Sequence, residues 1–303
     1  MIRMQNGMLV PDSPVNRMAR MAGGAFGVEG GSPTPPEPPA TEKDLYIEAT
    51  NGSSSVYAMV GIYDQLPDRF NIKYSTNGTT WKNLDIDYDA GQSEIIRLTQ
   101  GSKVWFRGVN SMLGCYNADA GIDRSFEFRF GGQSNRKFHV GGTVQSLVDG
   151  SGESLTAIPM SYLFNNNQHE FTVDEGLLPA TTLVEGCYSS MFSSCEKLKN
   201  APSLPATVLE KNCYTNMFGS CKELTQGPVL PAATLVESCY SQMFTSCFEL
   251  AAVTCLAEDI SATDCLGNWM NLVSGTGTFT KKAGIVYPNG YNGIPTGWTV
   301  VEV

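Results

Sequence analysis

The chain has 303 residues and a formal net charge of −10 at pH 7, with 17% charged residues. This length accommodates two or three domains with hydrophobic cores of their own. The acidic balance disfavours nucleic acid and anionic membrane surfaces as partners, because both select basic patches. No uninterrupted apolar stretch approaches the length of a membrane-spanning helix, so the sequence predicts no membrane insertion.

Residues 1–42 differ in composition from the rest of the chain. They hold five of the twelve methionines, and no period of 2 or 3.6 residues persists, so we expect no core of their own. Residues 33–39 are rich in proline and form a stiff spacer. The composition is compatible with a disordered tail, but adaptable methionines also suit packing into a partner surface. We predict an extended anchoring arm that binds its partners through residues 1–32, with these contacts: Met4, Met8, Leu9, Met18, Met21 and Phe26.

Residues 43–147 alternate between apolar and polar side chains, which is typical of antiparallel strands. Asn77-Gly78 is a strong hairpin signal between two of them. About 100 residues with short strands and frequent turns predict an immunoglobulin-like β-sandwich, although no Cys–Trp–Cys spacing supports it. The expected strands are Leu45–Ala49, Val56–Tyr63, Phe70–Ser75, Trp81–Leu84, Glu94–Leu98, Lys103–Gly108, Ser125–Phe130 and Arg136–Val140.

A 26-residue unit then repeats without insertions. One column of the repeat consists of cysteines: Cys187, Cys213, Cys239 and Cys265. A unit of this length cannot bury its own apolar face, so neighbouring units are expected to stack as a solenoid. At 100° per residue, the apolar positions of residues 187–195 share one side, which predicts an amphipathic helix of about three turns in each repeat. A short extended piece ends in each Leu-Pro pair, and one strand plus one helix per unit is typical of leucine-rich repeats.

The repeats are expected to occupy residues 148–273, with a degenerate first unit over residues 148–176 that caps the open end. Residues 274–303 form the predicted closing cap, which contains a strand at Trp298–Val303. The fold class is therefore mixed β and α/β. The predicted repeat core is Cys187, Met191, Phe192, Cys195, Cys213, Met217, Phe218, Cys221, Cys239, Met243, Phe244 and Cys247.

The consensus L-P-A-T-x-L-x-x-x-C-Y-x-x-M-F-x-x-C-x-x-L resembles the BspA-like leucine-rich repeats of gut Bacteroidetes and their phages. Gly293–Val300 looks like the usual C-terminal cap, and Lys73–Trp81 and Gly101–Gly108 resemble the β-domain that precedes such repeats. The likeness covers roughly residues 44–303. It implies this architecture and a surface or adhesive habit, since the family shares no catalysis that could be carried over.

The nine cysteines are expected to be small buried core residues. Disulfide bonds are less expected than buried free cysteines in a chain of this size that is made in a reducing compartment. Zinc is favoured least, because there is no C-x-x-C pair and only two histidines, His139 and His169.

Asp85, Asp87 and Asp89 place oxygen ligands at alternate positions, as calcium prefers, but the spacing does not match an EF-hand loop. Three alternating aspartates on the solvated face of a strand are the favoured explanation, with calcium binding as the alternative. No nucleophile motif or phosphate-binding glycine pattern is present, and the sequence predicts no catalytic, cofactor-binding or metal site.

Exposed positions vary from one repeat to the next, and variation on a constant scaffold is how solenoids build recognition surfaces. Unconstrained solvent-facing positions vary too. The candidate binding surface comprises Lys197, Lys222 and Phe248, of which Phe248 is an aromatic where the other copies carry a charge.

Residues 1–32 contain no continuous hydrophobic core between a basic start and a cleavage site, so we expect no secretory signal. With the repeats, this favours a phage virion protein, assembled in the bacterial cytoplasm and held on the virion surface by capsid, portal or tail proteins. Its repeats would bind a bacterial or mucosal glycan or protein. A homotrimer is compatible with such a fibre, although no coiled coil enforces it. A Bacteroidetes cell-surface adhesin is the alternative, and an enzyme or inhibitor has the weakest support.

Overall fold

The computed structural model describes residues 2–5, 8–11, 36–60, 70–84, 94–115 and 124–303. The chain divides into two compact units, Met1–Pro36 and Glu37–Val303. The described residues are mostly β-sheet, with one short helix, α2 (Ser146–Asp149), and one 3₁₀ turn, η1 (Glu175–Leu177). The β-rich part of the predicted fold class is therefore confirmed, whereas its helical part is wrong.

The first unit contains a two-stranded antiparallel sheet, β1 (Ile2–Gln5) and β2 (Met8–Pro11). Two strands of four residues are too short to show a persistent period in the sequence. A hairpin of this size is marginally stable by itself in water.

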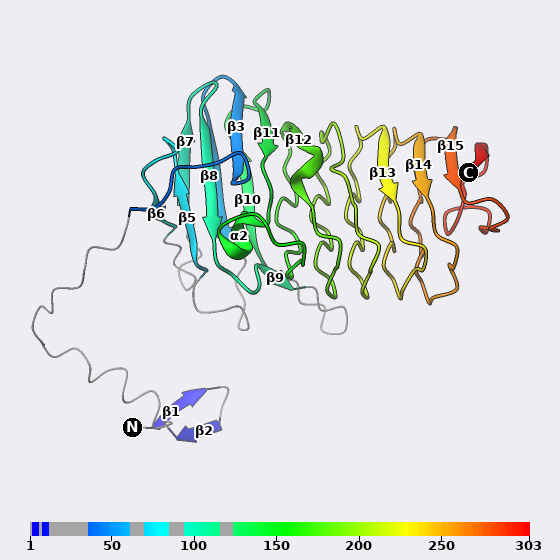
Figure 1. The fold of residues 1–303 in the computed structure, drawn as a ribbon, viewed down its shortest axis with the longest axis horizontal. Coiled ribbons are helices and arrows are strands. Elements are labelled where there is room, and N and C mark those ends of the chain that lie inside the picture. The colour runs from blue at the N-terminus through cyan, green and yellow to red at the C-terminus, as the bar shows by residue number, and fades with distance from the viewer. Residues whose placement is uncertain (1, 6–7, 12–35, 61–69, 85–93, 116–123) are drawn as a thin grey trace, which may run out of the picture. The chain divides into compact units, whose positions relative to one another are not determined.

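The second unit begins with two sheets. A six-stranded sheet has the order β12-β11-β3-β8-β5-β6, and a four-stranded sheet has the order β7-β4-β10-β9 (Figure 1). Their strands are β3 (Leu45–Asn51), β4 (Ser54–Val60), β5 (Ile72–Ser75), β6 (Lys82–Asn83), β7 (Glu94–Leu98), β8 (Lys103–Gly108), β9 (Gly114–Cys115), β10 (Arg124–Gly131), β11 (Lys137–Gly141) and β12 (Glu170–Val173).

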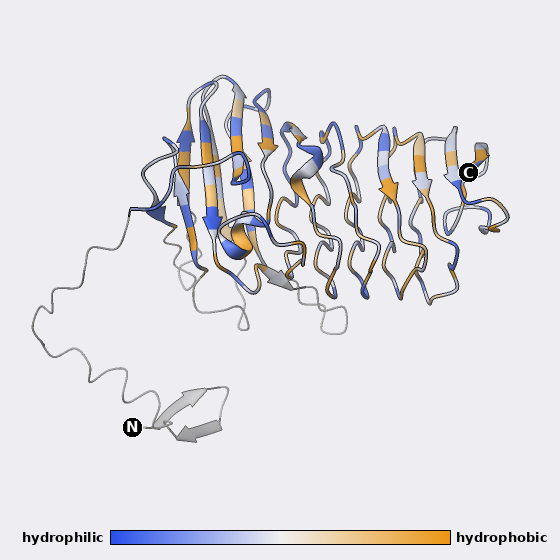
Figure 2. Cartoon of the chain, in the orientation of Figure 1, coloured by the Kyte–Doolittle hydropathy of each residue, from blue (hydrophilic) through white to orange (hydrophobic). Residues whose placement is uncertain are grey.

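The inner faces of the two sheets pack through aromatic rings. Phe106 of the six-stranded sheet lies 4.5 Å from Phe128 of the four-stranded sheet, and Phe130 stacks on Phe138 at the same centroid distance. Apolar and polar residues alternate along these strands (Figure 2), as the period of two requires for a sheet with one buried face. All eight predicted strands overlap an observed strand, whereas β9 and β12 were not predicted.

The six-stranded sheet continues directly into the repeats. Strand β12 belongs to the degenerate first repeat and pairs in parallel with β11. Behind it, the backbone N–H of Phe128 donates to the carbonyl of Leu163 at 2.8 Å, and Asn167 accepts from Phe130 at 2.6 Å. One cluster of buried hydrophobic residues therefore runs through both parts of this unit.

The predicted amphipathic helix of each repeat is wrong. Residues 187–195 form a row of tight turns, and alternate residues bond in different directions. The N–H of Met191 donates within its own coil to Tyr188, whereas the N–H of Tyr188 donates to Cys213 of the next coil at 2.9 Å. These backbone bonds between coils replace the i to i−4 ladder of a helix, and we call this side of the repeats the turn wall.

Backbone conformation explains why no helix forms. Every fourth residue of the turn wall has a positive φ, as at Gly186 (61°), Ser190 (53°) and Ser194 (60°). An α-helix needs a φ near −63° at every residue, so each of these positions interrupts it. The buried residues Cys187, Met191 and Cys195 consequently recur every four residues, a spacing that a helical period of 3.6 also fits over this length.

Side chains stack in columns inside the repeats. The rings of Phe164, Phe192, Phe218 and Phe244 lie 5.6–5.7 Å apart in nearly parallel planes. A second column stacks Tyr188, Tyr214 and Tyr240 at 6.0 Å. All twelve predicted repeat-core residues are fully buried. Each coil therefore completes the core of its neighbours, which a single unit could not do.

The opposite side of the later coils is a parallel sheet. Its strands are β13 (Gln226–Leu230), β14 (Ala252–Cys255), β15 (Gly277–Lys281) and β16 (Trp298–Glu302), in that order. Strand β16 agrees with the strand expected in the closing cap. At the same end, Asn292 and Tyr291 accept hydrogen bonds from the N–H groups of Asn268 and Met270, which closes part of the turn wall.

The positive φ positions of the turn wall give a stability prediction. Gln242 is exposed and has a φ of 56°. In an L-residue this conformation costs about 1–2 kcal/mol in the folded state. Glycine adopts it without strain, but glycine also raises the entropy of the unfolded chain, which offsets part of the stabilisation. Gln242→Gly is expected to raise the free energy of unfolding by about 0.5–1 kcal/mol in urea denaturation. Gln242→Ala is the control, because it keeps the Cβ, and a glycine variant less stable than this control would contradict the prediction.

Candidate functional site

The end of the proline-rich spacer is bound to the six-stranded sheet around Arg107 of β8. Arg107 and Asp44 are both buried and form a two-pronged ion pair, with Nε to Oδ1 at 3.1 Å and Nη2 to Oδ2 at 2.9 Å. Asp44 also accepts the backbone N–H of Thr41 at 2.7 Å. An arginine fork that matches a carboxylate in this way fixes both partners in one orientation.

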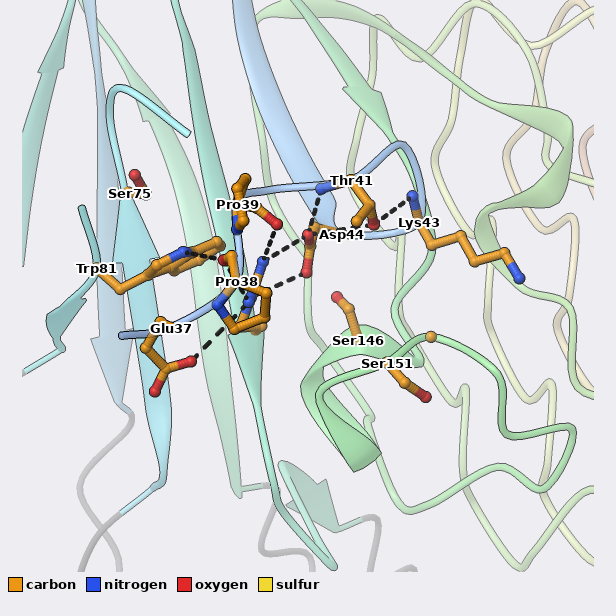
Figure 3. Close-up of polar contacts among 12 residues, drawn as sticks. Glu37, Pro38, Pro39, Thr41, Lys43, Asp44, Ser75, Trp81, Ser146 and Ser151 are labelled. Atoms are coloured by element: carbon orange, nitrogen blue, oxygen red, sulfur yellow. Dashed lines mark hydrogen bonds and ion pairs between the residues drawn. The ribbon is translucent and has the colours of Figure 1, made fainter. Parts of the chain in front are cut away.

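The same guanidinium reaches the spacer backbone (Figure 3). It donates through Nη1 to the carbonyl of Pro38 at 3.1 Å and through Nη2 to that of Pro39 at 3.2 Å. The indole of Trp81 donates to Pro38 at 3.0 Å, and its ring lies 3.6 Å from the Arg107 guanidinium carbon. Glu37 adds an ion pair with Lys73. We call Glu37, Pro38, Pro39, Asp44, Trp81 and Arg107 the linker clasp.

The linker clasp was not found in the sequence. Grooves that bind proline-rich segments use aromatic rings and donors that reach the carbonyl oxygens of the segment. Trp81 and Arg107 together were therefore the available signal for such a groove. Because Pro38 and Pro39 lack an N–H, their backbone can bond only through the carbonyl oxygens, and both donors aim at them. The clasp therefore sets the point at which the chain leaves the body toward the arm.

The described part of the arm carries three predicted contacts. Met4 lies on β1, and Met8 and Leu9 lie on β2. The other contacts, Met18, Met21 and Phe26, lie outside the described residues, as do the calcium candidates Asp85, Asp87 and Asp89.

The three residues of the predicted binding surface differ in exposure and in partners. Lys222 forms an ion pair with Glu196 of the preceding coil at 2.6 Å. Lys197 occupies the following position of the repeat and is half-buried. Phe248 follows Glu196 and Lys222 in the same 26-residue column and leaves 51% of its surface exposed. A carboxylate at position 248 could have paired with Lys222 and continued the alternation of charges. The column carries an exposed aromatic ring there instead.

A hydroxyl, an imidazole and a carboxylate meet on the outer face of β11 and β12. His139 Nδ1 lies 2.8 Å from the Thr172 hydroxyl, and its Nε2 lies 3.2 Å from Asp174. Hydrolases align the same three groups, but they add donors for an oxyanion. Here the surrounding sheet backbone is used in strand pairing. We interpret these contacts as support for the β11–β12 junction.

His169, the second histidine, is half-buried at the same junction. Its ring meets the edge of Phe138 at 5.5 Å. Burial lowers the pKa of His169, and the positive charge of Lys197 acts in the same direction. The two histidines thus occupy separate structural positions, and within the described residues no group of three or more His, Cys, Asp and Glu side chains could hold a metal ion.

The eight cysteines within residues 187–265 are all free and buried. Burial raises the pKa of Cys187, Cys195 and Cys247 to about 12, so at pH 8 about one thiol in 10,000 is ionised. We therefore expect iodoacetamide to leave all eight unmodified in the native protein and to modify them in urea, as followed by peptide mass spectrometry. Equal rates of modification at Cys187 in the two states would contradict this packing.

Within the described residues, no helix has the length and apolar character to cross a bilayer. No family model matches the chain, and neither a curated protein nor a solved structure matches it. Function is therefore inferred from the chain's own residues and geometry.

Proposed function

We propose that the protein is a structural and adhesive component of a phage particle, as a head or tail fibre or decoration. Its N-terminal arm binds capsid, portal or tail proteins, and its repeats face outward to bind a bacterial surface or mucosal glycan or protein. The observation that carries the proposal is the division into a small arm unit and a large body, with the linker clasp at the start of the body.

The body has the parts that a displayed adhesin needs. We propose that its two packed sheets are an immunoglobulin-like sandwich and that its coils are a leucine-rich-repeat solenoid of the BspA-like kind, with the turn wall in place of helices. The shared core and the backbone bonds between coils support a stiff body. Stiffness matters because a receptor-binding surface must be held away from the particle.

The arm has the properties of a segment completed by a partner. An isolated hairpin of two four-residue strands is marginally stable in water, and the arm sequence is rich in methionine. Residues 1–36 carry three arginines and two acidic residues, a net charge of +1, whereas the whole chain carries −10. The arm therefore differs from the body in charge as well as in composition, and this difference favours a separate binding role.

Photo-crosslinking in the native source tests this role. A photoreactive residue replaces Met8 on β2, and a matched variant carries it at exposed Val208 of the body. We expect mass spectrometry to recover a capsid, portal or tail protein from the Met8 variant and not from the Val208 variant. Capture of envelope components alone would overturn the virion role and favour the cell-surface adhesin.

Phe248 leaves about half of its aromatic side chain exposed, and we propose it as a central contact of the recognition surface. An aromatic ring on a stiff surface supplies much of the binding energy of typical interfaces. Recognition by the repeats is common to the virion protein and to the cell-surface adhesin. The partner of the arm, and not the ligand of the repeats, therefore distinguishes these two functions. The proposed function requires no catalysis.

A further inference from the structure

The C-terminal end of the repeats exposes an unpaired strand and a group of apolar side chains. Strand β16 is the last strand of its sheet, and within the described residues its outer side has no neighbour. The exposed apolar side chains at this end are Val286 (86%), Tyr291 (54%), Val300 (44%), Val301 (41%) and Val303 (59%). A repeat array normally ends in a cap with a polar outer face, so this end has the character of an interface.

The hydrogen bonds of β16 show which backbone groups are free. Val303 donates to the carbonyl of Lys281 and accepts from the N–H of Ala283. Alternate residues of a parallel strand bond to the same neighbour, so Thr299 and Val301 also bond to β15. The N–H and C=O groups of Val300 and Glu302 consequently point to the open side.

This edge has none of the usual protection against pairing. Trp298–Glu302 contains no proline, no lysine and no bulge, and its tryptophan, threonine and valines favour strands. Its single charged residue, Glu302, is already paired with Lys281 of β15. Another strand can therefore join the sheet without leaving a buried charge unpaired.

We propose that β16 pairs with β16 of a second copy of this chain, antiparallel and across a twofold axis at Val301. In this register Val300 faces the partner's Glu302 in a hydrogen-bonded pair, and the symmetric pair forms on the other side of the axis. The strand is self-complementary, because its free groups lie symmetrically about Val301 and its one carboxylate meets a valine and not a second carboxylate. The two four-stranded sheets then form one continuous sheet.

The register fixes what lies at the axis. Val301 bonds to its own β15, so the two copies of Val301 form a non-hydrogen-bonded pair, with Cα atoms about 4.5 Å apart. This separation falls within the range that a disulfide spans. The eight native cysteines within residues 187–265 are buried, so they compete little with a new exposed thiol.

Full-length protein carrying Val301→Cys is the direct test. Under mild oxidation it is expected to form a disulfide-linked dimer on a non-reducing gel. The matched control is Val229→Cys, since Val229 is exposed on the same face of the same sheet but is separated from the edge by β14 and β15. Equal crosslinking of both variants, or crosslinking of neither, would overturn the proposal.

Mass measurement by light scattering gives a second test that needs no crosslink. The wild-type chain is expected at twice its 32.7 kDa, and Val301→Lys is expected to raise the dimer dissociation constant at least tenfold, because it brings two like charges together at the axis. Val229→Lys is expected to leave it unchanged. A monomer at all concentrations, or a trimer insensitive to Val301→Lys, would contradict the pairing. The pairing does not depend on the anchoring role of the arm.

Discussion

Asp44→Ala is expected to lower the free energy of unfolding of the protein by about 3–5 kcal/mol. The substitution removes the bidentate carboxylate of the buried Arg107 guanidinium and leaves only the partly exposed Glu37, 3.9 Å away. A poorly compensated buried charge is far more costly than the loss of one hydrogen bond. It also removes the acceptor that holds the turn at Thr41. The linker clasp should therefore open at the place where the spacer joins the sheet.

Urea denaturation of the full chain measures this loss. Lys43→Ala is the neighbouring control, because Lys43 forms an exposed ion pair with Glu153 that should contribute about 0–1 kcal/mol. Asp44→Ala combined with Arg107→Met removes both charges and is expected to recover part of the stability. If Asp44→Ala were no more destabilising than Lys43→Ala, the clasp would not fix the spacer.

Phe218→Ala is expected to cost about 3–5 kcal/mol, which is typical of a large buried aromatic side chain. Its ring is fully buried and stacks at 5.7 Å on Phe192 of one neighbouring coil and on Phe244 of the other. The cavity would interrupt the column between two coils. A close-packed core with rings on both sides cannot collapse into this space without moving the backbone bonds of the turn wall.

The repeats supply their own control for this substitution. Phe248→Ala removes the same side chain from an exposed position and should change the free energy of unfolding by no more than about 0.5 kcal/mol. Thermal and urea unfolding of the two variants can be compared directly. Similar losses in both variants would show that the phenylalanine column does not hold the coils together.

The sheets of the body could be predicted because their information is local. Strand β3 alternates fully buried and partly buried residues over most of its length, and Asn77-Gly78 supplies the turn between neighbouring strands. The buried columns of the repeats were equally accessible, since a fixed period of 26 residues places Cys187 and Cys213 in equivalent environments.

The turn wall was misassigned because two structures share one spacing. Apolar residues every four positions satisfy a short helix as well as a row of turns. The distinguishing signal lay in the intervening residues with positive φ, such as Gly186, Asn212 and Asn268, since glycine and asparagine tolerate that region best. Ser190 and Gln242 adopt it without such a preference, and there the hydrogen bonds to the next coil impose the conformation.

The linker clasp could not be located from sequence alone. Arg107 and Asp44 are separated by 63 residues, and the pairing of β3 with β8 brings them together. Composition marked the spacer as proline-rich but did not show which of its carbonyls would be bound. The His139 contacts share this limit, because they depend on the parallel pairing of β11 with β12.

Incorporation into particles tests the anchoring role most directly. The full chain and a variant that begins at Glu37, the first residue of the body unit, are expressed in the native host together with the other particle proteins, and purified particles are analysed by quantitative mass spectrometry. Matching thermal unfolding of the body verifies that the shortened chain is folded. We expect the full chain in the particles and at least a tenfold loss of the shortened chain. Equal incorporation of the two chains, or absence of the full chain from particles, would contradict anchoring by the arm.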